Sequence, residues 1–373
     1  MKVIYDLQAY SFSPYGGVVR MFNETIARFN HKDDFSALLY KPSRILAEAP
    51  TGKNINMSLW TGLPGALRKH ALPRKIYHGL SDLFWRSHSA DIFHPSFYPL
   101  DAELFRFKTI VNIYDLIHEK IPHADDMPNH EQFLNLKKRA IEKADRLICI
   151  SNATRDDLLE HYNVDVDKIC VVYLGSNTNF RIMPEEESNR LAGDCADLQK
   201  PYILYIGSRQ RYKNFHRLLT AYQSWPANKD VDLVVVGAPQ KSADAAAHDL
   251  ASGTGTVRYL NFSGDDVLCA LYNKARFFVY PSLAEGFGIP LLESMASGCP
   301  VCVSDIPPFR EVAGDAAVYF DPLSVEDMRV SFDRALNARE DNSIDERNKK
   351  CVSRFSWDKC AEEMWKVYSE LLT

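Results

Sequence analysis

The sequence contains no apolar run that approaches the roughly 20 residues needed to cross a bilayer. Its first residues, Met1 to Leu7, carry an acidic residue where a secretory signal peptide would need its apolar stretch. We therefore expect a cytoplasmic protein whose first residues form a strand. The chain also lacks the positive charge typical of nucleic-acid binders, because its formal net charge is −5. No nucleic-acid partner is expected.

A zinc-finger pattern is absent as well. Among eight cysteines, Cys299 and Cys302 have the spacing of a redox or zinc motif, but no second Cys or His pair follows at zinc-finger spacing. The apolar residues around Cys302 are instead typical of a buried strand. We interpret both residues as small members of the core, and all eight cysteines as reduced thiols.

What the sequence does contain is an alternation of strand-like and helix-like segments. With 373 residues, the chain is long enough for two domains. Several short runs are almost continuously apolar, as in strands buried on both faces of a parallel sheet, and they lie at 109–113, 146–150, 202–206 and 232–236. The alternation predicts an α/β protein of two Rossmann-like, doubly wound domains. A stretch without strand periodicity at 176–200 places the boundary, so that the domains span 1–180 and 181–355. Such domains bind ligands at the carboxyl ends of their strands.

The strongest local motif follows the apolar run 276–280 and extends from Pro281 to Glu293. It reads as a strand, a glycine loop and a helix with Pro290 in its first turn. Gly286 and Gly288 would let backbone N–H groups approach an anion such as a diphosphate. Glu285 and Glu293 could accept hydrogen bonds from sugar or ribose hydroxyls. The alternative is a simple strand-to-helix junction whose acidic residues cap the helix.

The pair Glu285 and Glu293, separated by seven residues, resembles the paired-glutamate motif of retaining family-4 glycosyltransferases of the GT-B fold. The segments 295–301 and 304–311 extend this resemblance. It implies that Glu285 lies beside the transferred sugar and that Glu293 holds the ribose of a nucleoside-diphosphate sugar. It also implies that four backbone amides meet the diphosphate and sugar, those of Gly286, Phe287, Gly288 and Ile289. In such folds the last helix, here 356–373, crosses back onto the N-terminal domain.

A second segment, 207–215, resembles the loop of the same family that carries a basic residue and a Lys-Asn or Lys-Gly pair. Lys213 falls at the lysine position and would neutralise charge on a departing diphosphate. Many relatives place arginine where this chain has Ser208, so Arg209 or Arg211 must substitute, and we assign Arg209. As plain sequence, these charges are also compatible with a solvated surface loop.

The N-terminal half resembles the family less closely. Gly16 and Gly17 occupy the glycine-rich first turn, where they would approach donor phosphate or acceptor, although a simple tight turn fits equally. Asp115 and His118 are assigned as cleft-facing catalytic groups that contact the acceptor or sugar, in spite of Tyr114 at a position where many relatives have histidine. The alternative for His118 is an orienting or structural histidine. His94 is a weaker candidate for the cleft. Ser151 is interpreted as a helix cap.

The resemblance implies a metal-independent hexosyltransferase with no cofactor, acting with retention of configuration through front-side attack or a glutamate nucleophile. The Asp165–Asp167 pair fits a metal-site pattern but lies beside a helix end. By analogy we expect GDP-mannose as donor and a glycan or lipid-linked glycan of a bacterial surface polysaccharide as acceptor. Basic and aromatic residues in 63–87 indicate either a peripheral contact with the inner face of the plasma membrane or a solvated face. The alternatives are a non-catalytic sugar-nucleotide-binding scaffold subunit and a sugar phosphorylase or epimerase.

Overall fold

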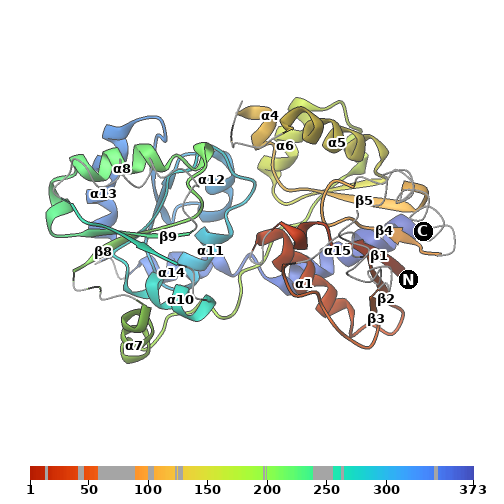
Figure 1. Ribbon diagram of the computed structural model, residues 1–373, viewed down its shortest axis with the longest axis horizontal. Coiled ribbons are helices and arrows are strands. Elements are labelled where there is room, and N and C mark those ends of the chain that lie inside the picture. The colour runs from red at the N-terminus through yellow and green to blue at the C-terminus, as the bar shows by residue number, and fades with distance from the viewer. Residues whose placement is uncertain are drawn as a thin grey trace, which may run out of the picture. The chain divides into compact units, whose positions relative to one another are not determined.

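The computed structural model shows two compact units (Figure 1). The first comprises Met1–Leu116, Asn129–Gly175 and Trp357–Thr373, and the second comprises Ile117–Pro128 and Ser176–Ser356. The structure describes residues 1–12, 16–40, 46–57, 89–99, 105–121, 124, 129–195, 198, 200–237, 255–261, 264–339 and 343–373. The segment 63–87, for which we predicted a membrane contact, lies outside these residues.

The first unit is built on a parallel sheet whose described strands follow the order β3-β2-β1-β4-β5-β6-β7. The strands are β1 (Lys2–Asp6), β2 (Ser36–Tyr40), β3 (Ile55–Met57), β4 (Ile92–Phe93), β5 (Lys108–Ile113), β6 (Arg146–Cys149) and β7 (Ile169–Val171). The helices of this unit include α1 (Gly17–Phe29), α5 (His130–Lys143), α6 (Asn152–His161) and α15 (Trp357–Leu372). The central strands are buried on both faces, which explains their continuous apolar sequence.

The C-terminal helix α15 belongs to the first unit, as predicted for the last helix, and packs against α1. Its Tyr368 is fully buried and contacts the rings of Phe29 and His94. The Tyr368 hydroxyl lies 3.1 Å from the hydroxyl of Tyr5 on β1. The last helix therefore contributes directly to the core of the unit that also contains the first strand.

The second unit has the strand order β10-β9-β8-β11-β12-β13, again parallel in each described pairing. Its strands are β8 (Tyr202–Ile206), β9 (Asp232–Val236), β10 (Val257–Leu260), β11 (Phe278–Tyr280), β12 (Val301–Ser304) and β13 (Ala317–Phe320). Its helices include α4 (Ile117–Lys120), α7 (Glu185–Cys195), α8 (Phe215–Ser224), α10 (Asp265–Lys274), α11 (Ile289–Ala296), α12 (Pro307–Ala313), α13 (Val325–Ala338) and α14 (Ile344–Val352).

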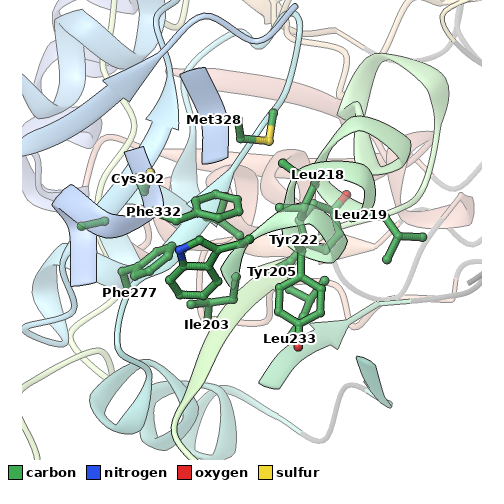
Figure 2. Close-up of a cluster of buried hydrophobic side chains, with 14 of the residues drawn as sticks. Ile203, Tyr205, Leu218, Leu219, Tyr222, Leu233, Phe277, Cys302, Met328 and Phe332 are labelled. Carbon is green, nitrogen blue, oxygen red and sulfur yellow. The ribbon is translucent and has the colours of Figure 1, made fainter. Parts of the chain in front are cut away.

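Two helices cover one face of this second sheet. Leu218 and Tyr222 of α8 and Phe332 of α13 pack with strand residues such as Ile203 and Leu233 (Figure 2). These side chains form one buried cluster, so α8 and α13 are held to the same face. Packing of this kind fixes the positions of the ends of the strands and of the loops that follow them.

Within the described residues, the predicted strands correspond to β5, β6, β8 and β9, and the α/β fold is confirmed. The division between the units lies at Gly175 and Ser176, whereas we placed it at 180 and 181. The segment Ile117–Pro128 also groups with the second unit. The predicted boundary segment 176–200 contains a helix, α7, that was not foreseen; its Glu185, Glu186 and Glu187 favour a helix N-terminus electrostatically.

The cysteine interpretation is confirmed for Cys299 and Cys302. Both are free and fully buried, and burial raises the pKa of the Cys299 thiol to about 11. They therefore behave as small core residues. Across the described ranges, no helix is long and apolar enough to cross a membrane.

Candidate active site

The site is organised by two neighbouring strands of the second sheet. β8 and β11 pair in parallel, so the loops that follow them leave from the same edge. The first loop carries Arg209 and Lys213, and the second carries Ser282, Glu285 and the glycines. A backbone hydrogen bond from Leu283 N to the carbonyl of Tyr212, 2.8 Å, joins the loops directly.

Lys213 and Glu285 form a largely buried ion pair. The Lys213 ammonium lies 2.6 Å from Glu285 Oε1, and the two side chains are 13% and 11% exposed. The Ser282 hydroxyl donates to the same carboxylate oxygen at 2.7 Å. Burial lowers the pKa of Lys213, but the Glu285 carboxylate together with Tyr280 and Tyr212 outweighs this effect, so that the pKa lies well above its ordinary value. The pair therefore places a fixed positive charge beside a carboxylate at the strand ends.

The backbone conformation after Lys213 favours asparagine at position 214. Its backbone is left-handed with φ of 57°, a conformation that asparagine and glycine tolerate best. The residue is buried, and its side-chain amide donates to the carbonyls of Pro281 and Pro322 at 3.0 and 2.7 Å. Asn214 therefore fastens the lysine loop to the start of the glutamate loop.

The glycine loop runs into α11 as predicted, with Pro290 in the first turn of the helix. Gly288 has φ of 106° and precedes the helix; a Cβ atom there would lie 3.0 Å from the ring of Phe309. Phe287 packs its buried ring on Phe355, with centroids 5.4 Å apart. Its side chain therefore anchors the loop, and only its backbone amide could meet a ligand. Gly286 and Ile289 flank this turn.

Glu293 lies on α11, one turn inside the helix, and is 5% exposed. The helix N-terminus ahead of it favours a negatively charged ligand. The carbonyl of Pro290 accepts a hydrogen bond from the Tyr272 hydroxyl at 3.2 Å, which ties the first turn of α11 to α10. Glu285 thus lies on the loop after β11, and Glu293 lies on the helix that directly follows this loop.

Arg209 and Arg211 occupy different surroundings. The Arg209 guanidinium lies 4.9 Å from the ring centre of Tyr259 and 5.8 Å from that of Phe215. Cation–π contacts of this kind hold the side chain in place. Arg211 lies on the short 3-10 helix Arg211–Lys213 and is exposed. The two arginines therefore differ in their surroundings, and the assignment of Arg209 stays a prediction.

In the first unit, Gly16 precedes α1 and Gly17 begins it. Gly16 is extended, with φ of −170°, and a Cβ atom would meet nothing within 4 Å, so sterics do not require glycine there. Asp115 follows β5 and is half-buried. Its backbone carbonyl accepts a hydrogen bond from the buried ammonium of Lys137 at 2.7 Å. The Tyr114 hydroxyl donates to the carbonyl of Ser96 at 2.9 Å.

His118 lies on α4, which groups with the second unit rather than with Asp115. Ile117 of α4 and the nearby Ala124 pack in one cluster with Ala284. Tyr212 joins this cluster, and its N–H donates to the carbonyl of Ala124 at 3.3 Å. The structure thus brings the helix of His118 to the loop of Glu285, a placement that sequence spacing did not reveal.

His94, the weaker candidate, lies in the core of the first unit instead of facing a cleft. It is fully buried, and its Nδ1 lies 2.5 Å from the Tyr368 hydroxyl. Burial lowers the pKa of His94 to about 3, so the ring is neutral near pH 7. Ser151 caps α6 as predicted, accepting from Thr154 N at 2.9 Å.

The Asp165–Asp167 pattern is a local turn. The Asp165 carboxylate accepts from the backbone N–H of Asp167 at 3.0 Å and caps a short 3-10 helix. Among the side chains that the structure describes, no three His, Cys, Asp or Glu residues gather as a metal site would require.

Two family models match the chain. The model described as Glycosyltransferase Family 4 matches residues 15–180, and the one described as Glycosyl transferases group 1 matches residues 195–351. O-antigen chain mannosyltransferase B from Escherichia coli is 27% identical over 100% of both chains. O-antigen chain mannosyltransferase RfbU from Salmonella typhimurium is 30% identical over 55% of this chain and 56% of its own.

Solved structures show the same fold. WaaG, a glycosyltransferase involved in lipopolysaccharide biosynthesis, superposes with a TM-score of 0.74 at 17% identity, covering 98% of this chain and 99% of WaaG. Sucrose-phosphate synthase from Thermosynechococcus elongatus gives 0.76 at 16% identity, covering 99% and 98%. These likenesses confirm the predicted architecture of two Rossmann-like domains.

Proposed function

Because the chain belongs to the family-4 glycosyltransferases of the GT-B fold, we propose that it is a retaining, metal-independent hexosyltransferase. In this proposal it transfers mannose from GDP-mannose to a glycan or lipid-linked glycan during synthesis of a bacterial surface polysaccharide. The choice of mannose and of a surface polysaccharide is supported by the O-antigen mannosyltransferases to which the chain is similar.

The observation that carries the proposal is the Lys213–Glu285 pair beside the glycine loop. A departing nucleoside diphosphate gathers negative charge, and Lys213, Arg209 and the amides at the start of α11 supply the opposite charge without a metal. A solved structural neighbour, Anabaena HepE at a TM-score of 0.75, is described in complex with UDP-glucose, which supports a nucleotide sugar as the donor class. The donor ribose would lie against Glu293.

The carboxylate of Glu285 supports front-side attack over a covalent intermediate. Its Oε1 already accepts from Lys213 and Ser282, and such hydrogen bonds reduce the nucleophilicity of a carboxylate. In front-side attack, the bond from the anomeric carbon to the diphosphate oxygen breaks as the acceptor hydroxyl oxygen bonds to the same face. The hydroxyl proton passes to the leaving diphosphate, and configuration is retained. Glu285 would then orient the sugar and stabilise positive charge at its ring.

The first test is binding and transfer with matched variants. Thermal unfolding is followed with GDP, UDP, ADP and their sugars for the wild type, Glu293→Ala and the surface control Glu326→Gln. A ligand that binds only the folded state raises the unfolding midpoint. We expect a shift with GDP or GDP-mannose that Glu293→Ala abolishes and Glu326→Gln retains. A nucleotide shift without transfer to any acceptor would support the scaffold alternative instead.

Retention and metal independence are tested on the product and with chelator. NMR of the product should show the donor's anomeric configuration, and activity should persist in excess EDTA. An inverted product contradicts retention, while activity lost in EDTA and restored by Mn²⁺ contradicts metal independence.

Binding to anionic vesicles at low salt tests the predicted membrane contact of 63–87 and a location at the inner face of the plasma membrane.

A further inference from the structure

A third side chain completes the Lys213–Glu285 pair. Tyr280 is the last residue of β11 and is buried. The Lys213 ammonium lies 3.3 Å from the Tyr280 hydroxyl and 5.3 Å from the centre of its ring. The ring of Tyr212 lies 5.0 Å from the same ammonium. The charge of Lys213 therefore sits among one carboxylate, one hydroxyl and two aromatic rings.

The ring of Tyr280 is itself held by packing. It contacts the ring of Phe309 with centroids 4.8 Å apart and that of Phe278 at 5.4 Å. Phe309 also lies against the turn at Gly288. Burial and the charge of Glu285 raise the pKa of Tyr280 well above its ordinary value, so the hydroxyl stays protonated. It is thus a fixed neutral dipole next to the Lys213 ammonium.

The number of N–H donors on the Lys213 ammonium indicates a role for the Tyr280 hydroxyl. A lysine ammonium carries three N–H donors. In Lys213, one is directed to Glu285 and one to the Tyr280 hydroxyl. One donor is then left for an oxygen of an incoming diphosphate. With Tyr280 as a fixed partner, the ammonium could turn towards the diphosphate without losing its place.

We propose that Tyr280 is a positioning residue that holds the Lys213 ammonium where the diphosphate leaves. This inference rests on the proposed function. Nothing in the motif pattern predicts it, because the residue is part of the strand ahead of the glutamate motif. Tyr280 acts through Lys213, so its contribution should vanish when Lys213 is removed.

The test is a double-mutant cycle of Tyr280→Phe and Lys213→Ala, measured as kcat and donor KM. Phenylalanine keeps the packed ring and removes only the hydroxyl. We expect Tyr280→Phe to lower kcat about 10-fold, the effect of one hydrogen bond to a charged group, with a smaller change in KM. On the Lys213→Ala background the same change should alter kcat by less than about 2-fold.

Tyr202→Phe is the matched control. Tyr202 is also buried on a neighbouring strand and also donates one hydrogen bond, to the carbonyl of Leu271 at 2.8 Å. It lies at the start of β8, the opposite end from the site. Tyr202→Phe should keep the wild-type kcat. Wild-type kcat in Tyr280→Phe, or an equal loss with and without Lys213, would overturn the proposal.

A failure of the proposed function is distinguishable. If the wild type transfers no sugar from any donor, that function is wrong, and the cycle is repeated on the dissociation constant of GDP or UDP by calorimetry. Tyr280→Phe should then weaken binding only when Lys213 is present. Equal binding by wild type and Tyr280→Phe, or binding of neither nucleotide by the wild type, overturns the assignment of Tyr280.

Discussion

In the first unit, the polar groups at the strand ends form hydrogen bonds with other residues of the same unit. Asp6, at the end of β1, accepts hydrogen bonds from the backbone N–H and the hydroxyl of Ser96, both at 2.8 Å. Tyr114 donates to the carbonyl of the same serine. In the second unit, the groups after β8 and β11 are instead two opposite charges, Lys213 and Glu285, on separate loops. The two units thus share an architecture but differ at their strand ends. In the first unit the polar groups there hydrogen-bond to the protein itself, and in the second unit they form an ion pair.

The difference indicates where ligand chemistry resides. A buried ion pair loses its hydration, and this cost offsets most of the attraction between the charges. Stability alone therefore gives little reason to place Lys213 against Glu285. A buried cation with a strongly raised pKa at the end of parallel strands is instead typical of a functional site. The hydrogen bonds to Ser96 in the first unit need no such explanation.

The largest expected effect breaks the charged pair. Glu285→Gln keeps the shape of the side chain but leaves the Lys213 charge without its partner. We expect kcat/KM to fall by about 10²–10³-fold, the usual cost of removing one preorganised charge from an active site. The control Glu326→Gln breaks an exposed ion pair with Arg329 in the same unit and should retain activity. If Glu285→Gln is active while Asp6→Asn is not, the comparison between the units is reversed.

The next effect concerns the closed core of the first unit. His94 has a pKa of about 3 when folded and an ordinary value of 6.5. Between these values only the unfolded chain takes up the proton, so stability is complete above pH 6.5 and falls as the pH drops towards 3. The loss is about 1.4 kcal/mol per pH unit, or about 2 kcal/mol by pH 5.

Hydrogen exchange followed by mass spectrometry reports the two units separately and checks this prediction. Peptides of β1, β4 and α15 should lose protection between pH 7 and 5, after correction for the intrinsic exchange rate. His94→Gln should be less stable at pH 7 but should show a shallower dependence on pH. An unchanged dependence in that variant assigns the acid sensitivity to other groups.

An effect of similar size tests the turn ahead of α11. Gly288→Ala places a Cβ at φ of 106° and 3.0 Å from Phe309. We expect the second unit to lose about 1–3 kcal/mol, through backbone strain and this contact. Gly264→Ala is the control, because Gly264 has φ of 109° but nothing within 4 Å of its Cβ position. The midpoint of thermal unfolding should fall further for Gly288→Ala; equal shifts would show that Phe309 gives way freely.

The smallest effect separates conformation from hydrogen bonding at Asn214. Asn214→Gly and Asn214→Ala both remove the bonds to Pro281 and Pro322, but only alanine resists the left-handed backbone. The two variants should therefore differ by about 1 kcal/mol in unfolding free energy, with the glycine variant more stable. Urea titration followed by tryptophan fluorescence, to which the buried Trp225 of the second unit contributes, measures the difference. Equal stabilities would mean that the backbone relaxes out of the left-handed region.

Local sequence chemistry predicted a large part of this protein. Continuous apolar runs predicted buried parallel strands, and a glycine loop followed by Pro290 predicted the turn into α11. The resemblance of the Glu285 and Glu293 pair to the paired-glutamate motif of a known family implied a sugar-nucleotide site, whose residue roles stay predictions. Misinterpretations arose where one composition suits two structures. The stretch 176–200 lacks strand periodicity, as a domain boundary does, but its acidic residues 185–187 begin a helix, and His94 fits a cleft edge and a core equally well by sequence.

The sequence by itself determined the strands, the glycine turn and the types of charge, because each depends on residues a few positions apart. Only the tertiary structure decided which loops meet. Lys213 and Glu285 are 72 residues apart in the chain, and they meet because β8 and β11 are neighbours in the sheet. The same packing places the Tyr280 hydroxyl beside the Lys213 ammonium and the helix of His118 beside Ala284. Contacts of this kind depend on the order of strands in a sheet, which no local pattern of residues encodes.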